Sequence, residues 1–383
     1  MQKKKVMTIF GTRPEAIKMA PLVKGLEETA EIESIVAVTA QHREMLDQVL
    51  SLFNISPDYD LDIMEAGQTL TDITSRVLKG MEKVFLKIKP DIVLVHGDTS
   101  TSFAASLAAY YQEIKVGHIE AGLRTYNKYS PFPEEMNRHL TGVLADLHFA
   151  PTRTSKENLL KENIDPSKIF VTGNTVIDAL YTVVKDNYQF EEELLNQIDF
   201  EKKKVILLTS HRRENLGKPM EDIFKAAKEI VLDNKDVEII FPVHLNPKVR
   251  EIATAVLMGV ERIHLIEAMD YQPFANLLAR SYMLLTDSGG IQEEAPGLGK
   301  PVLVLRDTTE RPEAITAGTV KLVGSNKNLI IDTASHLIKD QDSYLKMSKA
   351  VNPYGDGKAV ERIISRLLYE FGFTNNILDQ FEI

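Results

Sequence analysis

Carboxylates follow two neighbouring apolar runs in the first half of this chain. The run 91–97 ends just before Asp98, and the run 114–119 ends just before Glu120. Glu134 follows a proline-containing loop, where the pattern SPFPEEMNR predicts the start of a helix. Because ligands bind at the carboxyl edge of an open parallel sheet, we expect these acids to share one site. Crowding and partial burial would raise at least one pKa, which suits general acid–base chemistry.

Helix capping is the alternative explanation for each of these acids alone. Asp98 precedes Thr99 at one expected helix start, and Glu134 stands at another. Capping does not explain why three acids should converge with Arg124 and Arg138 among them. The combination therefore favours a site over three separate caps.

The segment 10–18 (FGTRPEAIK) predicts a strand, a tight turn at Gly11 and a helix whose first turn contains Pro14. Arg13 and Lys18 lie close to that helix start, so the turn could hold an anion. An ordinary turn with surface charges explains the same residues. The segment has neither the Walker pattern nor the GxGxxG pattern, which argues against ATP and a nicotinamide dinucleotide.

Histidines follow two strands in the second half of the chain. His211 opens the segment HRREN after the apolar run LLTS, and His244 ends the run PVH in a weaker copy of the pattern. A lone histidine is usually structural, but a His-Arg-Arg cluster at a strand end suggests substrate binding. The histidines lack HxxxH or HxH spacing with a matched carboxylate, so no metal is expected.

The segment LLTDSGGIQEEAPG predicts a phosphate-binding turn. Ser288, Gly289 and Gly290 open a helix directly after a strand, where backbone N–H groups can approach a phosphate. Glu293 and Glu294 lie one turn further along the helix, and an acid there could bind ribose hydroxyls. An ordinary helix start is the alternative for this segment taken alone.

Short apolar runs alternate with amphipathic segments along most of the chain. This alternation predicts parallel, doubly wound sheets. In 69–88 the apolar residues recur every three or four positions, which predicts a helix closed by Pro90. The expected strands are 5–10, 33–40, 91–97, 114–119, 146–150, 168–172, 204–210, 237–243, 262–266, 282–287, 301–305 and 319–324.

Two series of strands in 383 residues predict two domains of ordinary size. The expected fold class is α/β, with two Rossmann-like doubly wound domains facing a central cleft. Residues 1–172 would form the first domain, which carries the acids and is completed by a C-terminal helix within 357–383. Residues 173–356 would form the second domain, on the side that could hold a nucleotide diphosphate, and the charged segment 185–203 would join the two.

The composition narrows the function classes. The net charge of -10 argues against nucleic acid or an anionic membrane as the main partner. The absence of cysteine excludes disulfides and a cysteine nucleophile. No apolar run approaches the roughly 20 residues that span a membrane. The expected location is cytoplasmic.

Taken together, the segments FGTRPEAIKMAP, VHGDT, HIEAGLRT, SPFPEEMNR, TGN, HRREN, TDSGGIQEEAP and LRDTTERPE resemble the bacterial non-hydrolysing UDP-N-acetylglucosamine 2-epimerases. The resemblance runs from about residue 5 to about residue 370. It implies a glycosyltransferase-B-like fold, a homodimer and a reaction without metal or nicotinamide. The reaction interconverts UDP-N-acetylglucosamine and UDP-N-acetylmannosamine, through elimination of UDP to a bound 2-acetamidoglucal and re-addition with inversion at C2. Its product feeds cell-wall polysaccharides.

The resemblance also implies roles for single residues. Asp98, Glu120 and Glu134 would be the acid–base set, and Arg138 and His211 would complete the pocket, with His211 near the diphosphate. The residues expected to hold the rest of the substrate are Arg13 and Lys18 at the phosphates or sugar, Ser288, Gly289, Gly290 and Glu294 at UDP, and Phe274 beside the uracil.

Some members of this family carry a second UDP-N-acetylglucosamine site that activates the enzyme. Gln41, His42 and Gln68 match the region where that site forms. Glu44 and Gly67 stand where some relatives carry Gln and Arg, so this chain departs from the activated pattern.

Three other functions fit parts of the pattern. A UDP-sugar glycosyltransferase of the same fold would share the UDP seat but would not need three grouped acids. A hydrolysing 2-epimerase would release free N-acetylmannosamine. A non-catalytic nucleotide-sugar sensor would have no reason to keep Asp98, Glu120 and Glu134 together.

Overall fold

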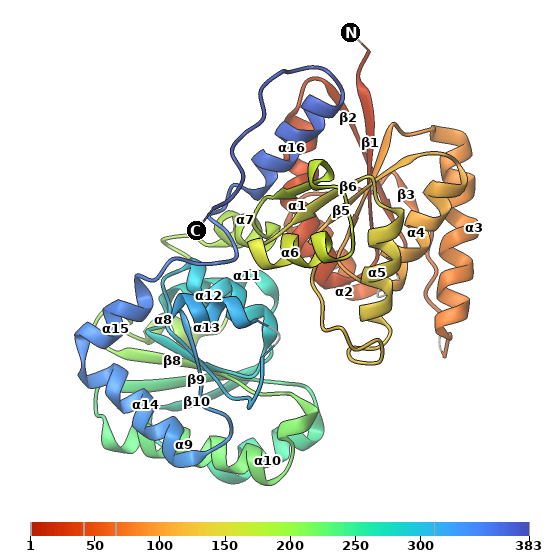
Figure 1. Ribbon diagram of the computed structural model, residues 1–383. Coiled ribbons are helices and arrows are strands. Elements are labelled where there is room, and N and C mark those ends of the chain that lie inside the picture. The colour runs from red at the N-terminus through yellow and green to blue at the C-terminus, as the bar shows by residue number, and fades with distance from the viewer. Residues whose placement is uncertain (1, 41–42, 66, 310, 383) are drawn as a thin grey trace. The chain divides into compact units, whose positions relative to one another are not determined.

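The computed structural model describes residues 2–40, 43–65, 67–309 and 311–382 (Figure 1). The chain divides into two compact units, one formed by Met1–Thr182 with Tyr354–Ile383 and the other by Val183–Pro353. We call them unit 1 and unit 2. Each contains one parallel sheet with helices packed against it, so the expected fold class of two Rossmann-like α/β domains is confirmed.

The sheet of unit 1 has seven strands in the order β3-β2-β1-β4-β5-β6-β7. The order reverses between β1 and β4, so the loops after these two strands meet at a topological switch point. The short β3 was not expected, because two residues carry no periodic signal. The strands are β1 (Lys4–Phe10), β2 (Ile32–Val38), β3 (Tyr59–Asp60), β4 (Ile92–His96), β5 (Lys115–Ile119), β6 (Leu147–Ala150) and β7 (Ile169–Val171).

Helices with apolar faces cover this sheet. The expected helix in 69–88 is α3, which begins with a capping box between Thr69 and Asp72 and ends at Lys89 in the left-handed conformation. Its buried Val77 and Met81 pack in one cluster with strand residues such as Val93. The helices of unit 1 are α1 (Arg13–Glu28), α2 (Arg43–Leu52), α3 (Leu70–Ile88), α4 (Ser100–Tyr111), α5 (Glu134–Leu144), α6 (Arg153–Lys161), η1 (Pro166–Lys168), α7 (Thr175–Val183) and α16 (Ala359–Glu370).

The C-terminal segment returns to unit 1, where α16 lies beside α1 (Figure 1). The two helices pack closely at Gly25, where an added Cβ would come within 2.7 Å of Val360 and Ile364. Further along, the Phe381 N–H donates to the Val171 carbonyl at 2.8 Å. The segment therefore adds both a helix and a backbone hydrogen bond at the edge strand β7.

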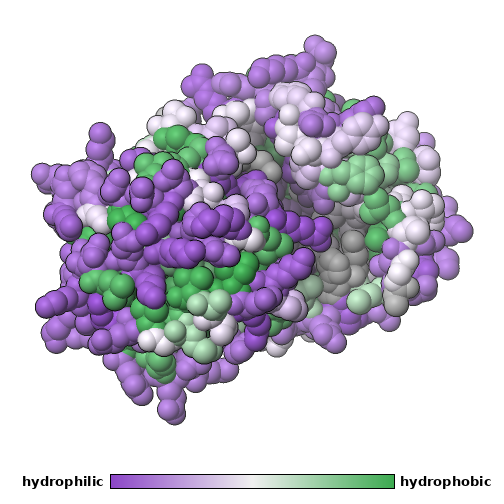
Figure 2. All heavy atoms as spheres, turned by 90° about the horizontal axis from the view of Figure 1, so that it is seen from below, coloured by the Kyte–Doolittle hydropathy of each residue, from purple (hydrophilic) through white to green (hydrophobic). Residues whose placement is uncertain are grey.

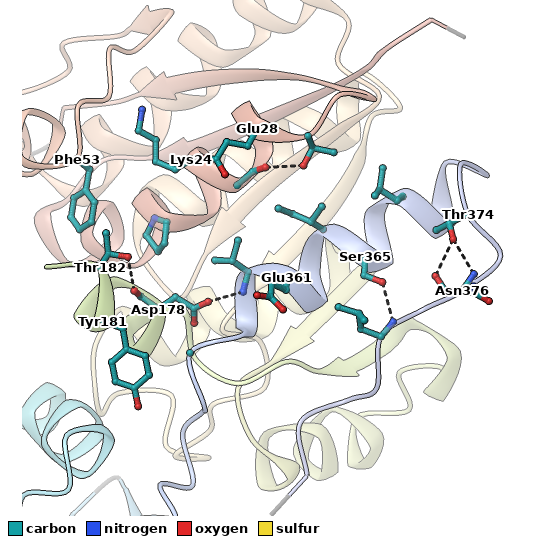
Figure 3. A pocket seen from close by; sticks show the side chains of 18 residues that line it. Lys24, Glu28, Phe53, Asp178, Tyr181, Thr182, Glu361, Ser365, Thr374 and Asn376 are labelled. Carbon is teal, nitrogen blue, oxygen red and sulfur yellow. Dashed lines mark hydrogen bonds between the residues drawn. The ribbon is translucent and has the colours of Figure 1, made fainter. Parts of the chain in front are cut away.

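A groove of about 990 Å³ lies between α1, α7 and α16 (Figure 3). Asp178 on α7 accepts hydrogen bonds from the N–H groups of Val360 and Ala359, at 3.0 and 3.3 Å, and so caps α16 from another helix. Burial raises the pKa of Asp178 to about 6, although these hydrogen bonds oppose the rise. The groove is thus closed on one side by a contact that holds the C-terminal helix in place.

Unit 2 has six parallel strands in the order β10-β9-β8-β11-β12-β13, with the reversal between β8 and β11. Its core packs apolar strand residues such as Leu208 and Phe241 against Phe224 of α9. The strands are β8 (Lys204–Thr209), β9 (Val237–Val243), β10 (Ile263–Glu267), β11 (Met283–Thr286), β12 (Val302–Val304) and β13 (Val320–Leu322). The helices are α8 (Glu193–Gln197), η2 (Arg213–Asn215), α9 (Lys218–Asp233), α10 (Pro247–Leu257), α11 (Tyr271–Arg280), α12 (Gly289–Gly297), α13 (Pro312–Ala317), α14 (Lys327–Lys339) and α15 (Gln341–Ser348).

The chain passes between the units at 182–183 and 353–354 rather than at the expected 172–173 and 356–357. Helix α7 falls in unit 1, where it buries Ile177 and Leu180 completely. The segment 185–203 falls in unit 2 instead of joining the units, and it buries Leu195 and most of Phe190. The apolar residues spaced through this charged segment therefore pack into unit 2.

Hydrophilic side chains cover most of the face shown in Figure 2, with smaller apolar patches between them. Among the described helices, none combines the length and the apolar character needed to cross a bilayer.

Candidate active site

Asp98 lies in the turn between β4 and α4, where α5 holds it from the side. Its Oδ2 accepts a hydrogen bond from Nε of Arg138 at 2.9 Å and forms an ion pair with Nη2 at 2.8 Å. Asn137, the residue before Arg138, donates its side-chain N–H to the Asp98 carbonyl at 2.9 Å. Burial raises the pKa of Asp98 above its usual value; Arg138 opposes the rise and Glu120 adds to it. Asp98 is therefore a carboxyl group that keeps a proton to higher pH than an exposed aspartate does.

Glu120 follows β5 directly and lies at the same edge of the sheet. It forms an ion pair with Lys18 of α1, and its Oε2 accepts a hydrogen bond from the Asn174 side chain at 2.8 Å. Its φ of 60° places a non-glycine residue in the left-handed region, which costs roughly 1–3 kcal/mol. Strain of this kind persists where the surrounding contacts hold the residue, as at ligand sites.

Glu134 begins α5 but makes no hydrogen bond or ion pair through its side chain with another described residue. Its neighbour Glu135 is buried and accepts hydrogen bonds from the Thr125 and Tyr126 N–H groups and from Arg138. Burial alone would raise the pKa of Glu135, but these bonds hold it below its usual value. Glu135 thus shapes the loop, while Glu134 stays available to a ligand.

The capping alternative is wrong for both acids that could have served as caps. The N-cap of α4 is Thr99, whose hydroxyl accepts the Ser102 N–H at 3.0 Å, so Asp98 is not needed there. The N-cap of α5 is Pro133, and no side chain caps that helix. Neither carboxylate caps its helix, although Glu134 lies in the first turn of α5, where the helix dipole favours an acid.

The N–H groups of the turn after β1 are bound by a carboxylate of the protein itself. The Glu15 carboxylate accepts the N–H groups of Gly11 and Thr12 at 3.0 and 2.8 Å. It also accepts the hydroxyls of Thr99 and Ser102 at 2.6 and 3.0 Å, which ties this turn to the turn that holds Asp98. Burial raises the pKa of Glu15, and these hydrogen bonds oppose the rise.

These contacts change the expectation for Arg13 and Lys18. Because Glu15 occupies two N–H groups at the start of α1, a ligand anion would have to rely on side chains there. Lys18 already pairs with Glu120. The Arg13 guanidinium makes no ion pair or hydrogen bond with the described residues, so it is the cation of this turn left for a ligand.

Gly11 is needed for close packing rather than for an unusual backbone angle. A Cβ at this position would lie 2.0 Å from Oγ1 of Thr39 and 2.7 Å from Oγ1 of Thr101. These two hydroxyls are hydrogen-bonded to each other at 2.9 Å behind the turn. The glycine lets the turn after β1 sit directly against them.

In unit 2, the turn after β8 is shaped by Asp287, which follows β11. Asp287 is completely buried, and its carboxylate accepts the N–H groups of His211 and Arg212, both at 2.9 Å through Oδ2. The Ser210 hydroxyl and the Asn215 side chain donate to the same carboxylate at 3.1 and 3.0 Å. The buried acid thus joins the loops on either side of the switch point in unit 2, as Glu15 does in unit 1.

His211 and His244 lie together at the carboxyl edge of unit 2. Their rings stack with centroids 5.3 Å apart and an interplanar angle of 15°. Nδ1 of His211 lies 3.4 Å from Oδ1 of Asp287, and Nδ1 of His244 accepts the Asn246 N–H at 3.1 Å. The structure therefore brings together the two histidines that the sequence placed after neighbouring strands.

The start of α12 is open to a ligand. The Ser288 hydroxyl makes no capping bond, and a Cβ added at Gly290 would meet no described atom within 4 Å. The Arg212 guanidinium approaches the same helix start, with Nη2 3.8 Å from a Cβ built on Gly289. Backbone N–H groups at a helix start beside a guanidinium suit an anion such as a phosphate.

The acids within α12 differ in their partners. Glu293 is buried in an ion pair with Arg311. Glu294 is also buried and lies beside Tyr271, whose pKa is raised well above its usual value by burial and by this carboxylate. Phe274 lies on α11, one turn after Tyr271, and is partly exposed. Of the two acids, Glu294 is thus the one near an aromatic helix that could flank a base.

Gln68 accepts a long hydrogen bond from Arg76 at 3.4 Å, and the preceding Gly67 has a positive φ of 75°. Gln41 and His42 lie outside the described residues. Of the three residues expected at the second site, Gln68 is therefore the only one that the structure describes.

The model of one protein family, described as UDP-N-acetylglucosamine 2-epimerase, matches residues 24–368. The chain belongs to this family. A 2-epimerase from Bacillus subtilis (strain 168), named UDP-N-acetylglucosamine 2-epimerase, is 59% identical over 381 residues, covering 100% of this chain and 99% of the relative. Membership makes the protein a bacterial UDP-N-acetylglucosamine 2-epimerase, which is an isomerase, and sets aside the glycosyltransferase and sensor alternatives.

Solved structures of epimerases share the fold. The S. aureus MnaA–UDP co-structure has a TM-score of 0.86 at 54% identity, over 99% of this chain and 100% of that chain. The UDP-GlcNAc 2-epimerase from Neisseria meningitidis bound to UDP-GlcNAc has a TM-score of 0.82 at 53% identity, over 95% of this chain and 100% of that chain.

Sequence reasoning missed several residues of the candidate site. His96 at the end of β4 is buried, with Nε2 3.7 Å from Oε2 of Glu120. Burial lowers the pKa of His96 to about 4, although Glu120 opposes the change, so the ring is neutral near pH 7. Asn174 and Asp287 were missed as well. The segments VHGDT, TGN and TDSGG contained all three, but nothing local showed which partners they would meet.

Proposed function

We propose that this epimerase interconverts UDP-N-acetylglucosamine and UDP-N-acetylmannosamine without hydrolysis. Two relatives more than half identical to it were solved with UDP and with UDP-GlcNAc, which supports this substrate. The observation that carries the proposal is the pairing of acids with cations at one edge of unit 1: Asp98 with Arg138 and Glu120 with Lys18.

The proposed reaction starts from a C2 proton that is not acidic by itself, since no carbonyl group is adjacent to it. As the C1–O bond to UDP breaks, C1 gains cationic character, which acidifies the C2–H bond. Removal of that proton forms the C1–C2 double bond of a 2-acetamidoglucal. Return of a proton to the opposite face of C2 and of UDP to C1 gives the epimer, so atoms and charge balance.

Asp98, Glu120 and Glu134 form the proposed acid–base set. Asp98 has a raised pKa, which brings its proton affinity closer to that needed near neutral pH. Glu120 is held by Lys18 and Asn174, so its position is fixed. Glu134 has no partner among the described residues and can turn toward a ligand.

Unit 2 supplies the proposed UDP-binding groups. The open start of α12, from Ser288 to Gly290, and the neighbouring Arg212 would bind the diphosphate, with His211 beside them. Cations and N–H dipoles at a leaving diphosphate stabilise the charge that develops there, which accelerates the elimination. Glu294 would accept hydrogen bonds from the ribose, and Phe274 would lie beside the uracil.

The decisive experiment follows solvent hydrogen at C2. Purified protein is incubated with UDP-N-acetylglucosamine in D₂O, and the sugar is examined by proton NMR. We expect loss of the C2 proton signal, appearance of deuterated UDP-N-acetylmannosamine and no free sugar. Release of N-acetylmannosamine would show a hydrolysing enzyme, and an unexchanged C2 with folded protein would exclude epimerisation.

A homodimer is also proposed. Met136, Leu140 and Val143 form one stripe along α5 and are 38%, 40% and 79% exposed. A stripe of exposed apolar side chains on a helix usually marks a protein contact, and a second copy of this chain is the proposed partner. Light scattering coupled to gel filtration should give twice the 43.1 kDa chain mass.

Two substitutions test whether this surface forms the dimer contact. Val143→Glu should halve the measured mass, whereas Leu232→Glu, a control at an exposed residue of α9 in unit 2, should not change it. A wild-type mass of one chain would contradict the dimer.

A further inference from the structure

The loop after β8 depends on a carboxylate that comes from a different strand. The Asp287 carboxylate accepts hydrogen bonds from two backbone N–H groups, one hydroxyl and one side-chain amide of residues 210–215. In addition, Nε of Arg212 donates to the Asp287 carbonyl at 3.3 Å. The direction in which His211 and Arg212 leave the sheet is therefore set by Asp287 rather than by the loop itself.

The His211 ring also meets this carboxylate. Its Nδ1 lies 3.4 Å from Oδ1 of Asp287. A carboxylate at one ring nitrogen favours the proton on that nitrogen, and the other nitrogen then presents a lone pair. His211 is thus expected to carry its proton on Nδ1 and to present Nε2 as an acceptor.

His244 has the reverse arrangement. Its Nδ1 accepts the Asn246 N–H at 3.1 Å, so this nitrogen cannot carry a proton. A neutral ring must then carry its proton on Nε2, where it is a donor. Because the two rings stack 5.3 Å apart, an acceptor and a donor stand side by side.

The surroundings keep His211 neutral at rest. Burial lowers its pKa below the usual value; Asp287 opposes the change, while His244 and Arg212 add to it. Asp287 would stabilise the charged ring if a bound diphosphate drew a proton to Nε2. The same carboxylate therefore serves the resting and the ligand-bound forms.

We propose that Asp287 is a positioning residue that fixes His211 with its proton on Nδ1, while the Asn246 backbone N–H fixes His244 with its proton on Nε2. The stacked pair presents one acceptor and one donor at the carboxyl edge of unit 2. This inference rests on the proposed function only in assigning the pair to UDP, since the two protonation patterns can be observed in the free protein.

The first test uses the full chain labelled with ¹⁵N-histidine. Long-range ¹H–¹⁵N spectra at pH 8 report which ring nitrogen carries the proton, and His211→Gln and His244→Gln assign the signals. We expect the Nδ1–H form for His211 and the Nε2–H form for His244. Finding the same form for both rings would overturn the proposal, whether or not the protein epimerises its substrate.

The second test removes the Asn246 N–H. The φ of Asn246 is -60°, which proline can adopt, so Asn246→Pro removes the donor with little backbone strain. Asn246→Ala is the matched control, since it also removes the side chain that caps Lys248 but keeps the N–H. The His244 signal should change only in the proline variant, and a change in both or in neither would contradict the proposal.

The third test separates positioning from folding at Asp287. In Asp287→Asn, the His211 signal should leave the pure Nδ1–H form, and kcat for C2 exchange should fall roughly 10–100-fold, as for other residues that orient a histidine. Ser210→Ala removes a different donor to the same carboxylate and should keep the His211 form and most activity. An unchanged His211 signal in folded Asp287→Asn would refute the positioning role. If Asp287→Asn does not fold, the spectra of the wild type and of the two Asn246 variants still show which nitrogen of each ring carries the proton.

Discussion

Lys18 and Glu120 are 102 residues apart in the sequence and form an ion pair at the carboxyl edge of unit 1. Both side chains are largely shielded, with 15% and 8% of their surfaces exposed. Removing one partner from such a pair leaves a poorly solvated charge, so the two residues should behave as a unit.

The ion pair predicts strongly non-additive kinetics. Lys18→Met and Glu120→Gln should each lower kcat by roughly 10²-fold or more, and the double variant should lose little beyond the worse single variant. Steady-state kinetics of all four proteins complete the cycle. Multiplicative losses in the double variant would show that the residues act independently.

Asp98→Asn tests the acid–base role. The amide keeps the shape of the side chain but cannot carry the transferred proton, so turnover should fall by roughly 10²–10⁴-fold, the usual contribution of a general acid or base. UDP affinity, measured by calorimetry, should stay near the wild-type value because the proposed UDP-binding groups lie in unit 2. If UDP binding collapsed together with turnover, Asp98 would be a structural residue.

Gly11→Ala tests the packing of the turn after β1. The added methyl would lie 2.0 Å from Oγ1 of Thr39, so the turn must shift, at a cost of about 1–3 kcal/mol in unfolding free energy. Urea unfolding measures this cost. Gly290→Ala is the contrasting variant: it meets open space and should unfold like the wild type while weakening UDP binding. Equal stability of the two variants would exclude the clash.

Burial lowers the pKa of His148 to about 4, from 6.5 for an ordinary histidine, with Arg124 and Lys168 adding to the effect. The folded protein therefore disfavours protonation at this site. The stability that His148 contributes is complete above pH 6.5 and is lost as the pH falls toward 4, at about 1.4 kcal/mol per pH unit.

His148→Leu should remove this loss. The unfolding free energy of the variant relative to wild type should rise by about 1 kcal/mol between pH 6.5 and pH 5.5, measured by urea unfolding. A difference that stays constant with pH would mean that His148 accepts a proton in the folded state.

The sequence predicted the elements of this fold well because their signals are local. Apolar periodicity gave α3, and both ends of every expected strand fall within two residues of the observed bounds. Strand ends followed by Asp98, Glu120 and His211 located the edges that carry the charged groups. The division of the chain was harder, because the apolar residues of α7 and α8 do not reveal which core they enter.

The hydrogen bonds that hold the loops of the candidate site in place could not be predicted from the sequence. In the sequence, Glu15 is an ordinary acid in the first turn of a helix. In the structure, it accepts hydrogen bonds from N–H groups and hydroxyls of two loops. Asp287 looked like the end of a strand, yet it holds the loop that starts at Ser210. Contacts of this kind depend on strands that are neighbours in the sheet but far apart in the sequence, and no local pattern reports them.

The return of residues 354–382 to unit 1 sets the order in which the chain can mature during translation. Unit 2 is one continuous segment and can fold as soon as it has left the ribosome. Unit 1 must wait for α16 and for the strand contact of Phe381, although most of its residues are made first. The acids of the candidate site in unit 1 are thus synthesised early but gain their full support last, so a nascent chain would hold a folded unit 2 before it holds a finished unit 1.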